Sequence, residues 1–138
     1  MVLTTAGLAL GACGGGDGGI AVDDPWIRPT PPGAESTAFY ATITNDSEVD
    51  DRLVAVGSPL CSMAEVHLTS MDDGVMSMAP AGTDELAVAK DESLRLEPGG
   101  LHVMCMGLTD SVVEGDGVML TLEFETSDPV EIEAVARP

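Results

Sequence analysis

The sequence predicts an all-β domain, either a sandwich or a barrel, and three observations support this prediction. Short segments alternate between apolar and polar residues, which is the period of a strand with one buried face. Turn-forming residues separate these segments at intervals of roughly ten residues. No stretch of about twelve or more residues carries the apolar stripe of an amphipathic helix. A length of 138 residues fits one such domain.

Seven segments share the alternating or β-branched pattern and are expected to form strands: residues 37–44, 52–56, 64–68, 94–96, 101–108, 118–125 and 130–135. The first ends at Asn45-Asp46, which is a turn signal. A Glu-Pro-Gly-Gly turn at 97–100 separates the fourth segment from the fifth. The last two alternate almost without interruption. We find no internal repeat and no second domain.

The composition is strongly acidic, and this narrows the possible partners. Asp and Glu number 24 against five Lys and Arg, so the formal net charge is −19. Nucleic acid and anionic lipid surfaces are poor partners for such a chain, because both are bound through clustered Lys and Arg. A hydrophobic content of 44% is too high for a disordered acidic tail. We find no nucleophile–base signature and no cofactor-binding loop, and we expect no enzymatic activity.

The N-terminal residues predict export and lipidation. Residues 1–12 are apolar and too few to span a bilayer, which is typical of a signal peptide. The segment Leu10-Gly11-Ala12-Cys13 resembles the bacterial lipobox, in which cleavage leaves a lipidated cysteine at the mature N-terminus. The Gly-rich residues 13–19 then predict a flexible tether to a domain over residues 20–138. We therefore expect an extracytoplasmic lipoprotein, anchored to the cell membrane only through Cys13.

Histidine and methionine concentrate between positions 63 and 106. Both histidines of the chain, His67 and His102, lie in this window. So do six of the eight methionines: Met63, Met71, Met76, Met78, Met104 and Met106.

Strand periodicity predicts the direction of these side chains. Because side chains alternate along a strand, His102, Met104 and Met106 are expected on the face opposite the apolar Leu101, Val103 and Cys105. By the same rule His67 points away from the apolar face of its strand, and Met76 shares a face with Met78. These residues are therefore expected off the core-facing side, where large apolar side chains gain nothing from burial.

An imidazole beside thioethers on such a face favours a Cu(I) site. The thioether is a soft, uncharged donor that prefers Cu(I) to zinc, magnesium or calcium, and imidazole binds copper in both oxidation states. Such a site needs no thiolate, which would be open to oxidation outside the cytoplasm. Taken singly, each methionine or histidine is more often structural. The same-face pair His102 and Met104, together with His67 and Met78, favours the metal.

These residues resemble the motif of the PCuAC family of periplasmic copper chaperones. The family's motif is a histidine, ten residues, a methionine, twenty-one residues and then His-x-Met. In this chain His67 is followed by ten residues, Met78, twenty-three residues and His102-Val103-Met104. We expect the two extra residues in the loop at 80–85. Further landmarks resemble the family: Trp26-Ile27-Arg28, Pro32-Gly33, Ala38-Phe39-Tyr40, Ile43-Thr44-Asn45, Gly74-Val75-Met76, Pro98-Gly99-Gly100-Leu101-His102 and Met106-Gly107-Leu108.

The resemblance implies a cupredoxin-like, Greek-key β-sandwich that binds one Cu(I) through His67, Met78, His102 and Met104. Met76 is the substitute for Met78, and Met106 is an accessory candidate. The resemblance also implies delivery of copper for assembly of the cytochrome oxidase copper centre, to an oxidase subunit or alongside a thioredoxin-like factor. We expect transfer by stepwise ligand exchange.

Two other functions compete with this interpretation. A blue-copper electron carrier needs a cysteine thiolate with two histidines and an axial methionine, and Cys105 is available but is expected on the face opposite His102. The other alternative is a lipoprotein for adhesion or interaction without a metal.

The cysteines complete the expectations. With Cys13 lipidated, Cys61 and Cys105 remain as an even pair in an oxidising compartment, and we expect a disulfide between them. Two buried free thiols, or Cys61 as an accessory copper ligand, are the alternatives.

Overall fold

A computed structural model describes residues 19–138, apart from the side chains of Asp72 and Thr83. The predicted signal peptide, Cys13 and residues 14–18 of the tether lie outside the described residues. The elements of the described part are β1 (Ile20–Ile27), β2 (Ser36–Asn45), β3 (Asp51–Gly57), β4 (Cys61–Asp72), β5 (Val75–Pro80), the 3₁₀-helix η1 (Thr83–Leu86), β6 (Ala87–Val88), β7 (Ser93–Leu96), β8 (Leu101–Leu108), β9 (Gly117–Phe124) and β10 (Val130–Ala136). The all-β prediction is confirmed.

All seven predicted segments form strands, and β8 has the predicted bounds. The sequence pattern missed β1, because Asp23, Asp24 and Pro25 interrupt its alternation. The structure accommodates this interruption with a shift of register between Asp23 and Trp26, and Asp24 there has a φ of 54°. Such an irregularity lets one strand continue across residues that disfavour a regular ladder.

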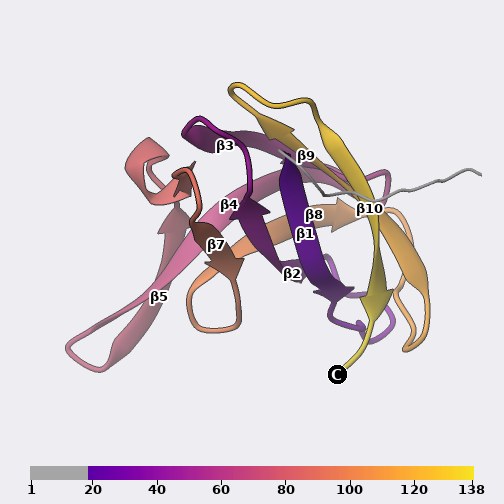
Figure 1. Cartoon of the computed structure of the whole chain (residues 1–138). Coiled ribbons are helices and arrows are strands. Elements are labelled where there is room, and N and C mark those ends of the chain that lie inside the picture. The colour runs from indigo at the N-terminus through magenta and orange to yellow at the C-terminus, as the bar shows by residue number, and fades with distance from the viewer. Residues whose placement is uncertain (1–18) are drawn as a thin grey trace, which may run out of the picture.

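The strands form one curled sheet (Figure 1). Their order is β5-β4-β8-β2-β1-β10-β9-β3-β6, and β7 pairs with β2. The long strand β2 pairs with β8 through residues 36–39 and with β7 through residues 41–44, so it joins two parts of the sheet. Because the sheet curls, β3 contacts β4, and the core lies between the resulting layers. The two layers of the predicted sandwich are therefore continuous.

The core is apolar and draws on most of the strands. Its largest fully buried side chains are Phe39, Ile27, Ile43, Leu53, Leu120, Leu122, Val88, Val103 and Val112. Val103 and Cys105 are both fully buried, as the alternation along β8 predicts.

A disulfide joins Cys61 to Cys105, with a Cα–Cα distance of 5.3 Å. It connects the start of β4 to β8, and Ala64 lies directly opposite Cys105 in the ladder. The bond therefore fixes the two strands that carry the histidines.

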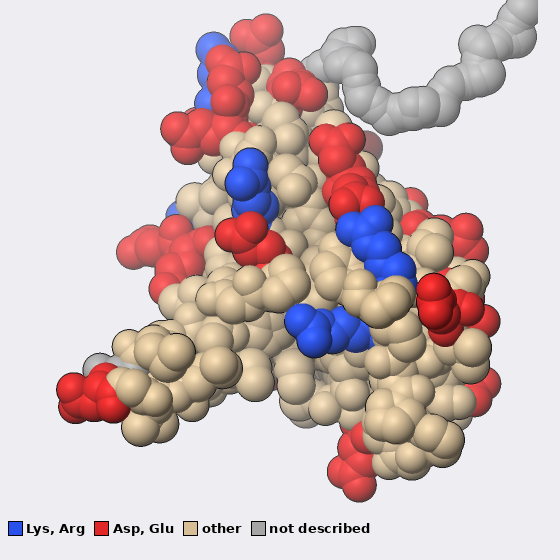
Figure 2. Space-filling model, turned by 90° about the horizontal axis from the view of Figure 1, so that it is seen from below, with Lys and Arg blue, Asp and Glu red and all other residues tan. Residues whose placement is uncertain are grey.

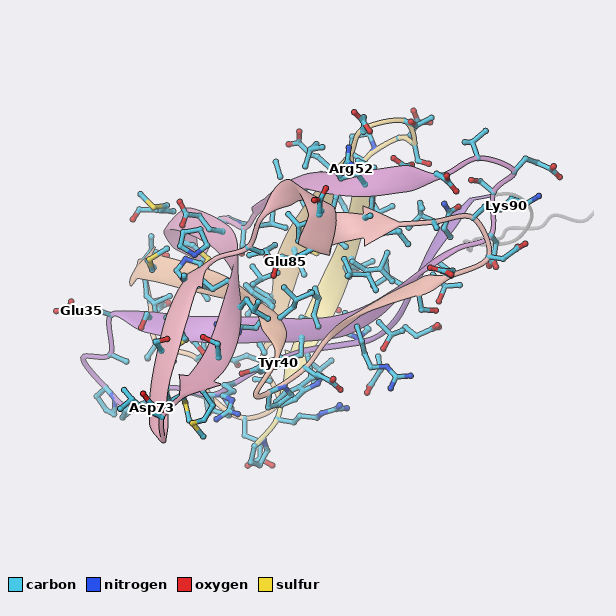
Figure 3. The ribbon with its side chains drawn as sticks, turned by 90° about the vertical axis from the view of Figure 1, so that its left-hand side faces the viewer. Glu35, Tyr40, Arg52, Asp73, Glu85 and Lys90 are labelled. Carbon is cyan, nitrogen blue, oxygen red and sulfur yellow. A yellow bond between two sulfur atoms is a disulfide. The ribbon has the colours of Figure 1, made fainter. Side chains whose placement is uncertain are left out.

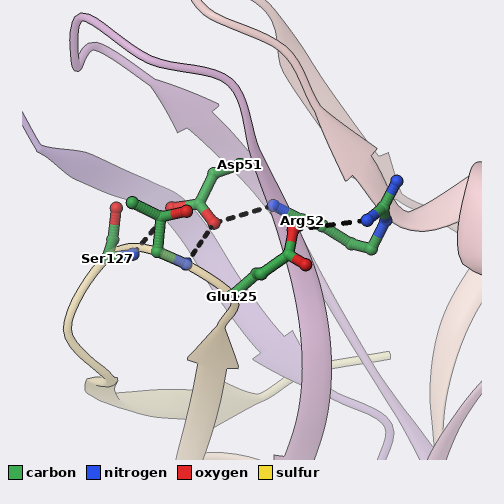
Figure 4. A network of polar contacts seen from close by, with 5 residues as sticks. Asp51, Arg52, Glu125 and Ser127 are labelled. Carbon is green, nitrogen blue, oxygen red and sulfur yellow. Dashed lines mark hydrogen bonds and ion pairs between the residues drawn. The ribbon is translucent and has the colours of Figure 1, made fainter.

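Asp51, the first residue of β3, anchors the β9–β10 turn (Figure 4). Its carboxylate accepts hydrogen bonds from the backbone amides of Arg52 at 2.8 Å, Thr126 at 2.8 Å and Ser127 at 2.9 Å. Burial acts to raise the pKa of Asp51, but hydrogen bonds from Ser127 and from these amides outweigh it and hold the pKa below its ordinary value. Beside it, Arg52 pairs with Glu125 at 3.3 Å.

Candidate metal site

The predicted ligands meet because of the register between β4 and β8. His67 lies directly opposite His102, and Glu65 lies directly opposite Met104. Side chains of directly opposed residues share one face of a sheet, and diagonal neighbours lie within reach of long side chains. The imidazole ring centroids of His67 and His102 are 6.2 Å apart. Two histidines and one methionine therefore converge on the face that points away from Val103.

A tight hairpin brings Met78 to the same face. Asp73 and Gly74 connect β4 to β5 with φ angles of 53° and 78°, which is the geometry of a two-residue hairpin turn. The resulting register sets Met78 opposite Thr69 and Met76 opposite Met71. Because Thr69 follows His67 by two positions, Met78 is a diagonal neighbour of His67. His67 thus has His102 directly opposite and Met78 and Met104 as diagonal neighbours, all on one face of the sheet.

The turn before β8 orients His102. Gly99, with a φ of 84°, follows Pro98 in a turn closed by a hydrogen bond from the Gly100 amide to the Glu97 carbonyl at 3.0 Å. The Gly100 carbonyl in turn accepts a hydrogen bond from the His102 ring at Nδ1, at 3.1 Å. It also accepts one from the Thr69 amide at 3.2 Å, which ties the turn to β4.

These contacts determine which ring nitrogens are free. A carbonyl oxygen only accepts hydrogen bonds, so in the neutral imidazole, the form that binds a metal, Nδ1 of His102 carries the proton and Nε2 keeps its lone pair. The Nε2 atom of His67 lies 3.0 Å from Oε1 of Glu65 and donates to this carboxylate. Nδ1 of His67 therefore keeps its lone pair. Each imidazole thus offers one nitrogen to a metal, while its other nitrogen is held in place.

The burial of His102 differs from the sequence expectation of an open face. His102 points away from the core, as the parity predicts, but it is only 4% exposed. Tyr40, which is 5% exposed, has its ring centroid 6.4 Å from that of His102, so a second side chain fills the space beside the histidine. Only the pairing of β2 with β8 brings this tyrosine to the site.

A groove of about 510 Å³ opens on this face. Among its lining residues are His102, Met104, Met76, Met78, Tyr40 and Thr69. Both Met76 and Met78 thus reach the groove, and the choice between them stays open. Met106 lines a neighbouring depression with Glu35 and Ser36, and Met104 borders both hollows.

An aromatic row continues from the histidines across the sheet. The Tyr40 ring, labelled in Figure 3, lies 4.6 Å from the ring of Trp26, centroid to centroid. The guanidinium of Arg28 lies over Tyr40 at 5.5 Å, and that of Arg137 lies over Trp26 at 4.8 Å. Hydrogen bonding to Arg137 also holds the pKa of Asp24 below its ordinary value. This row restricts the freedom of Tyr40 and therefore of His102.

Sequence reasoning missed Tyr40 as a neighbour of the site and Glu65 as a contact of His67. The Glu65 contact had a signal in the sequence, since residues two apart on a strand share a face. Tyr40 had none, because its proximity depends on which strands pair. Within residues 19–138, no group of three or more His, Cys, Asp and Glu side chains is arranged to hold a metal.

Two further observations concern a blue-copper site and a membrane-spanning helix. Both cysteines of the described range are joined in the disulfide, so neither supplies the thiolate that a blue-copper site needs. Among residues 19–138, we find no helix with the length and apolarity required to cross a bilayer.

Comparisons with known proteins show which family and fold this chain shares. The LpqE-like lipoprotein family model matches residues 20–136. A relative from Leifsonia xyli subsp. xyli, Lxx21020, is named as a lipoprotein and is 27% identical over 116 residues, which are 83% of this chain and 68% of the relative.

Solved structures share the fold. The apo PCuAC domain from PmoF1 superposes with a TM-score of 0.71 at 27% identity, over 87% of this chain and 94% of that domain. The Cu(I) form of DR1885 from Deinococcus radiodurans has a TM-score of 0.62 at 27% identity, over 84% of this chain and 76% of that protein. The fold is therefore that of the PCuAC domain, a cupredoxin-like β-sandwich, as the sequence resemblance implies.

Proposed function

The chain belongs to the LpqE-like lipoprotein family, and we propose that it is an extracytoplasmic copper chaperone that binds one Cu(I) and passes it on by ligand exchange. The ligands in this proposal are His67, Met78, His102 and Met104. The observation that carries the proposal is the β4–β8 register, which sets His67 opposite His102 with Met104 and Met78 as diagonal neighbours of His67.

The donor set suits Cu(I) as a cargo. Two imidazole nitrogens and two thioethers are soft or intermediate donors that bind as neutral groups, so the site needs no thiolate. Nε2 of His102 and Nδ1 of His67 have free lone pairs in the observed hydrogen bonding. The likeness to the Cu(I) form of DR1885, at 27% identity, supports the same cargo here.

The site also suits release of Cu(I) to an acceptor. Met78 is 53% exposed and lies on the edge strand β5, whereas His102 is buried. An incoming ligand from an acceptor therefore reaches the ion from the Met78 side and displaces this thioether first. His102 and Met104 then leave last, because their strand is held on both sides by β4 and β2. The copper stays Cu(I) throughout, and each bond that breaks is replaced by one to the acceptor.

We propose that the acceptor belongs to cytochrome oxidase assembly, as either the oxidase subunit that holds the copper centre or a thioredoxin-like factor. We also propose that Cys13 is lipidated and anchors the chain to the cell membrane. Membership of a lipoprotein family and the lipoprotein relative from Leifsonia support this location. No enzymatic turnover is needed for this role.

An anaerobic Cu(I) titration against a chromophoric chelator tests the ligand set. We expect one tight equivalent for the wild type, and a loss of at least about tenfold in affinity for His102→Gln and for Met104→Leu. Met119→Leu is the matched control, because Met119 is exposed but lies on β9. Wild-type affinity in both site variants would disprove the assignment.

A further inference from the structure

The β4–β5 hairpin carries a set of exposed methionines that the proposed site does not use in full. Met71 is 67% exposed, Met76 is 62% exposed and Met78 is 53% exposed. Every residue of β5 is exposed, and β5 is the edge of the sheet. Figure 1 shows the hairpin extending away from the rest of the sheet. Core packing therefore does not account for these thioethers.

The register gathers the three methionines on one face. Met71 lies directly opposite Met76, and Met78 follows Met76 by two positions. Directly opposed Cβ atoms are about 5 Å apart in such a ladder, and methionine has three flexible side-chain bonds, so the sulfurs can converge on one ion. The other face of the hairpin is polar at the same level, where the hydroxyls of Ser70 and Ser77 lie 3.2 Å apart. The thioethers are thus confined to one side of the hairpin.

This thioether face continues into the proposed copper site. Met76 and Met78 line the same groove as His102 and Met104. Met78 is a diagonal neighbour both of Met71, towards the hairpin turn, and of His67, towards the site. It can therefore contribute its sulfur to an ion on either side.

The surface of the hairpin also favours a cation. Figure 2 shows it as an arm, at the left, that is mostly uncharged and bears an acidic side chain at its end. Asp73 is exposed at the turn, as Figure 3 also shows. A carboxylate there attracts cations without occupying the thioether face.

We propose that Met71, Met76 and Met78 form a second, weaker Cu(I) site, through which the ion enters the site at His67 and His102. This proposal rests on the proposed function. Three neutral thioethers select Cu(I) by softness alone, and without imidazole donors they hold it less tightly. In the inward step, the bonds from copper to Met71 and Met76 break while bonds to His67, His102 and Met104 form, and Met78 stays bound. No electron or proton is exchanged.

Methyl-¹³C-methionine NMR during an anaerobic Cu(I) titration tests this site. We expect the first equivalent to shift the methyl signals of Met78 and Met104, and the second to shift those of Met71 and Met76. In the Met71→Leu variant, the second equivalent binds at least several-fold more weakly and the first is retained, because Met71 is not a candidate ligand of the first site. Leucine preserves size and apolarity, so the fold is expected to persist. Loading of the first equivalent from a Cu(I)–chelator complex should also become several-fold slower.

The matched control is Met63→Leu, because Met63 is also exposed on β4 but lies opposite Met106 of β8, outside the hairpin. Weaker binding of the second equivalent in this control, but not in Met71→Leu, would overturn the proposal. A second Cu(I) equivalent that shifts the methyl signals of neither Met71 nor Met76 would also overturn it. The His102→Gln variant separates the hairpin site from the proposed copper site at His67 and His102. If its first equivalent shifts the hairpin methyls alone, the hairpin site exists independently. If wild-type copper never shifts Met104 but does shift Met71 and Met76, the proposed function fails while the hairpin site stands.

Discussion

Two pairs of antiparallel strands in this molecule, β4–β8 and β9–β10, share a pattern but not a chemistry. Both bury their inward residues, such as Val103 in the first pair and Leu120 in the second. The outward residues differ. In β9–β10 they include Thr121, paired with Glu131, whereas in β4–β8 they include His67, paired with His102.

The difference teaches how to separate scaffold from site in a β protein. Alternation alone places both pairs in the sheet, because the period of two is satisfied by any outward side chain. Carboxylates on an outward face are explained by their hydration. A single exposed thioether such as Met119 on β9 is also ordinary, but several thioethers gathered beside two histidines on β4, β5 and β8 call for another cause. A variant in the scaffold pair should therefore change stability alone, and one in the site pair should change copper affinity alone.

Removal of the disulfide is the strongest way to break this separation, because the bond links β4 to β8 from the core side. We expect Cys61→Ala/Cys105→Ala to lower the free energy of unfolding by about 2–4 kcal/mol. Urea unfolding of oxidised wild type, reduced wild type and the variant measures this effect. The loss of Cu(I) binding free energy should be smaller than this loss of stability, because the hydrogen-bonded ladder between β4 and β8 remains. Equal stability of all three samples would show that the bond constrains nothing.

Substitution of Asp51, which holds the β9–β10 turn, tests the scaffold pair by itself. Asp51→Ala leaves the amides of Arg52, Thr126 and Ser127 without their acceptor, and we expect a loss of about 1–3 kcal/mol at neutral pH. Copper affinity should not change. The stability of Asp51→Asn, which keeps one acceptor oxygen, should lie between those of the wild type and Asp51→Ala.

The same carboxylate predicts a dependence on pH. Because its pKa is lower in the folded state, Asp51 stabilises the fold above the ordinary aspartate pKa of about 4. That contribution is lost as the pH falls below about 4. The stability difference between wild type and Asp51→Ala should therefore shrink in acid. A difference that grows on acidification would contradict this account.

Removal of the Glu65 carboxylate sharpens the comparison from the site side and has the smallest expected effect. Glu65 holds Nε2 of His67 and its side chain is 45% exposed, so Glu65→Ala should hardly alter unfolding. We expect Cu(I) affinity to fall about tenfold, because His67 loses its fixed proton position. Glu65→Gln keeps an acceptor and should retain most of the affinity. ¹⁵N NMR of the imidazole would detect the change of tautomer, and an unchanged tautomer in Glu65→Ala would argue against this role.

The strands were predictable wherever alternation was uninterrupted. The segment 101–108 forms β8 with the predicted bounds, and its outward and inward faces follow the expected parity. β1 was not predictable in this way, because Asp23-Asp24-Pro25 breaks the pattern and only a shift of register against β2 preserves the pairing.

The site was predictable in its composition and less so in its surroundings. Spacing and residue type selected His67, Met78, His102 and Met104 as candidates. The hydrogen bonds that free one nitrogen on each imidazole depend on Glu65 and on the Gly100 carbonyl, and the latter required the turn before β8. The burial of His102 depends on Tyr40, sixty-two positions away in the sequence.

The sequence by itself determined the all-β fold class, the inward and outward faces of most strands, and the residue types that favour Cu(I). These are local properties, since alternation and side-chain chemistry do not depend on the partner strand. The tertiary structure decided which outward residues meet. Register between distant strands is a property of the whole sheet. It sets His67 opposite His102, brings Tyr40 beside the site, and separates the hairpin methionines from the pair Met63 and Met106.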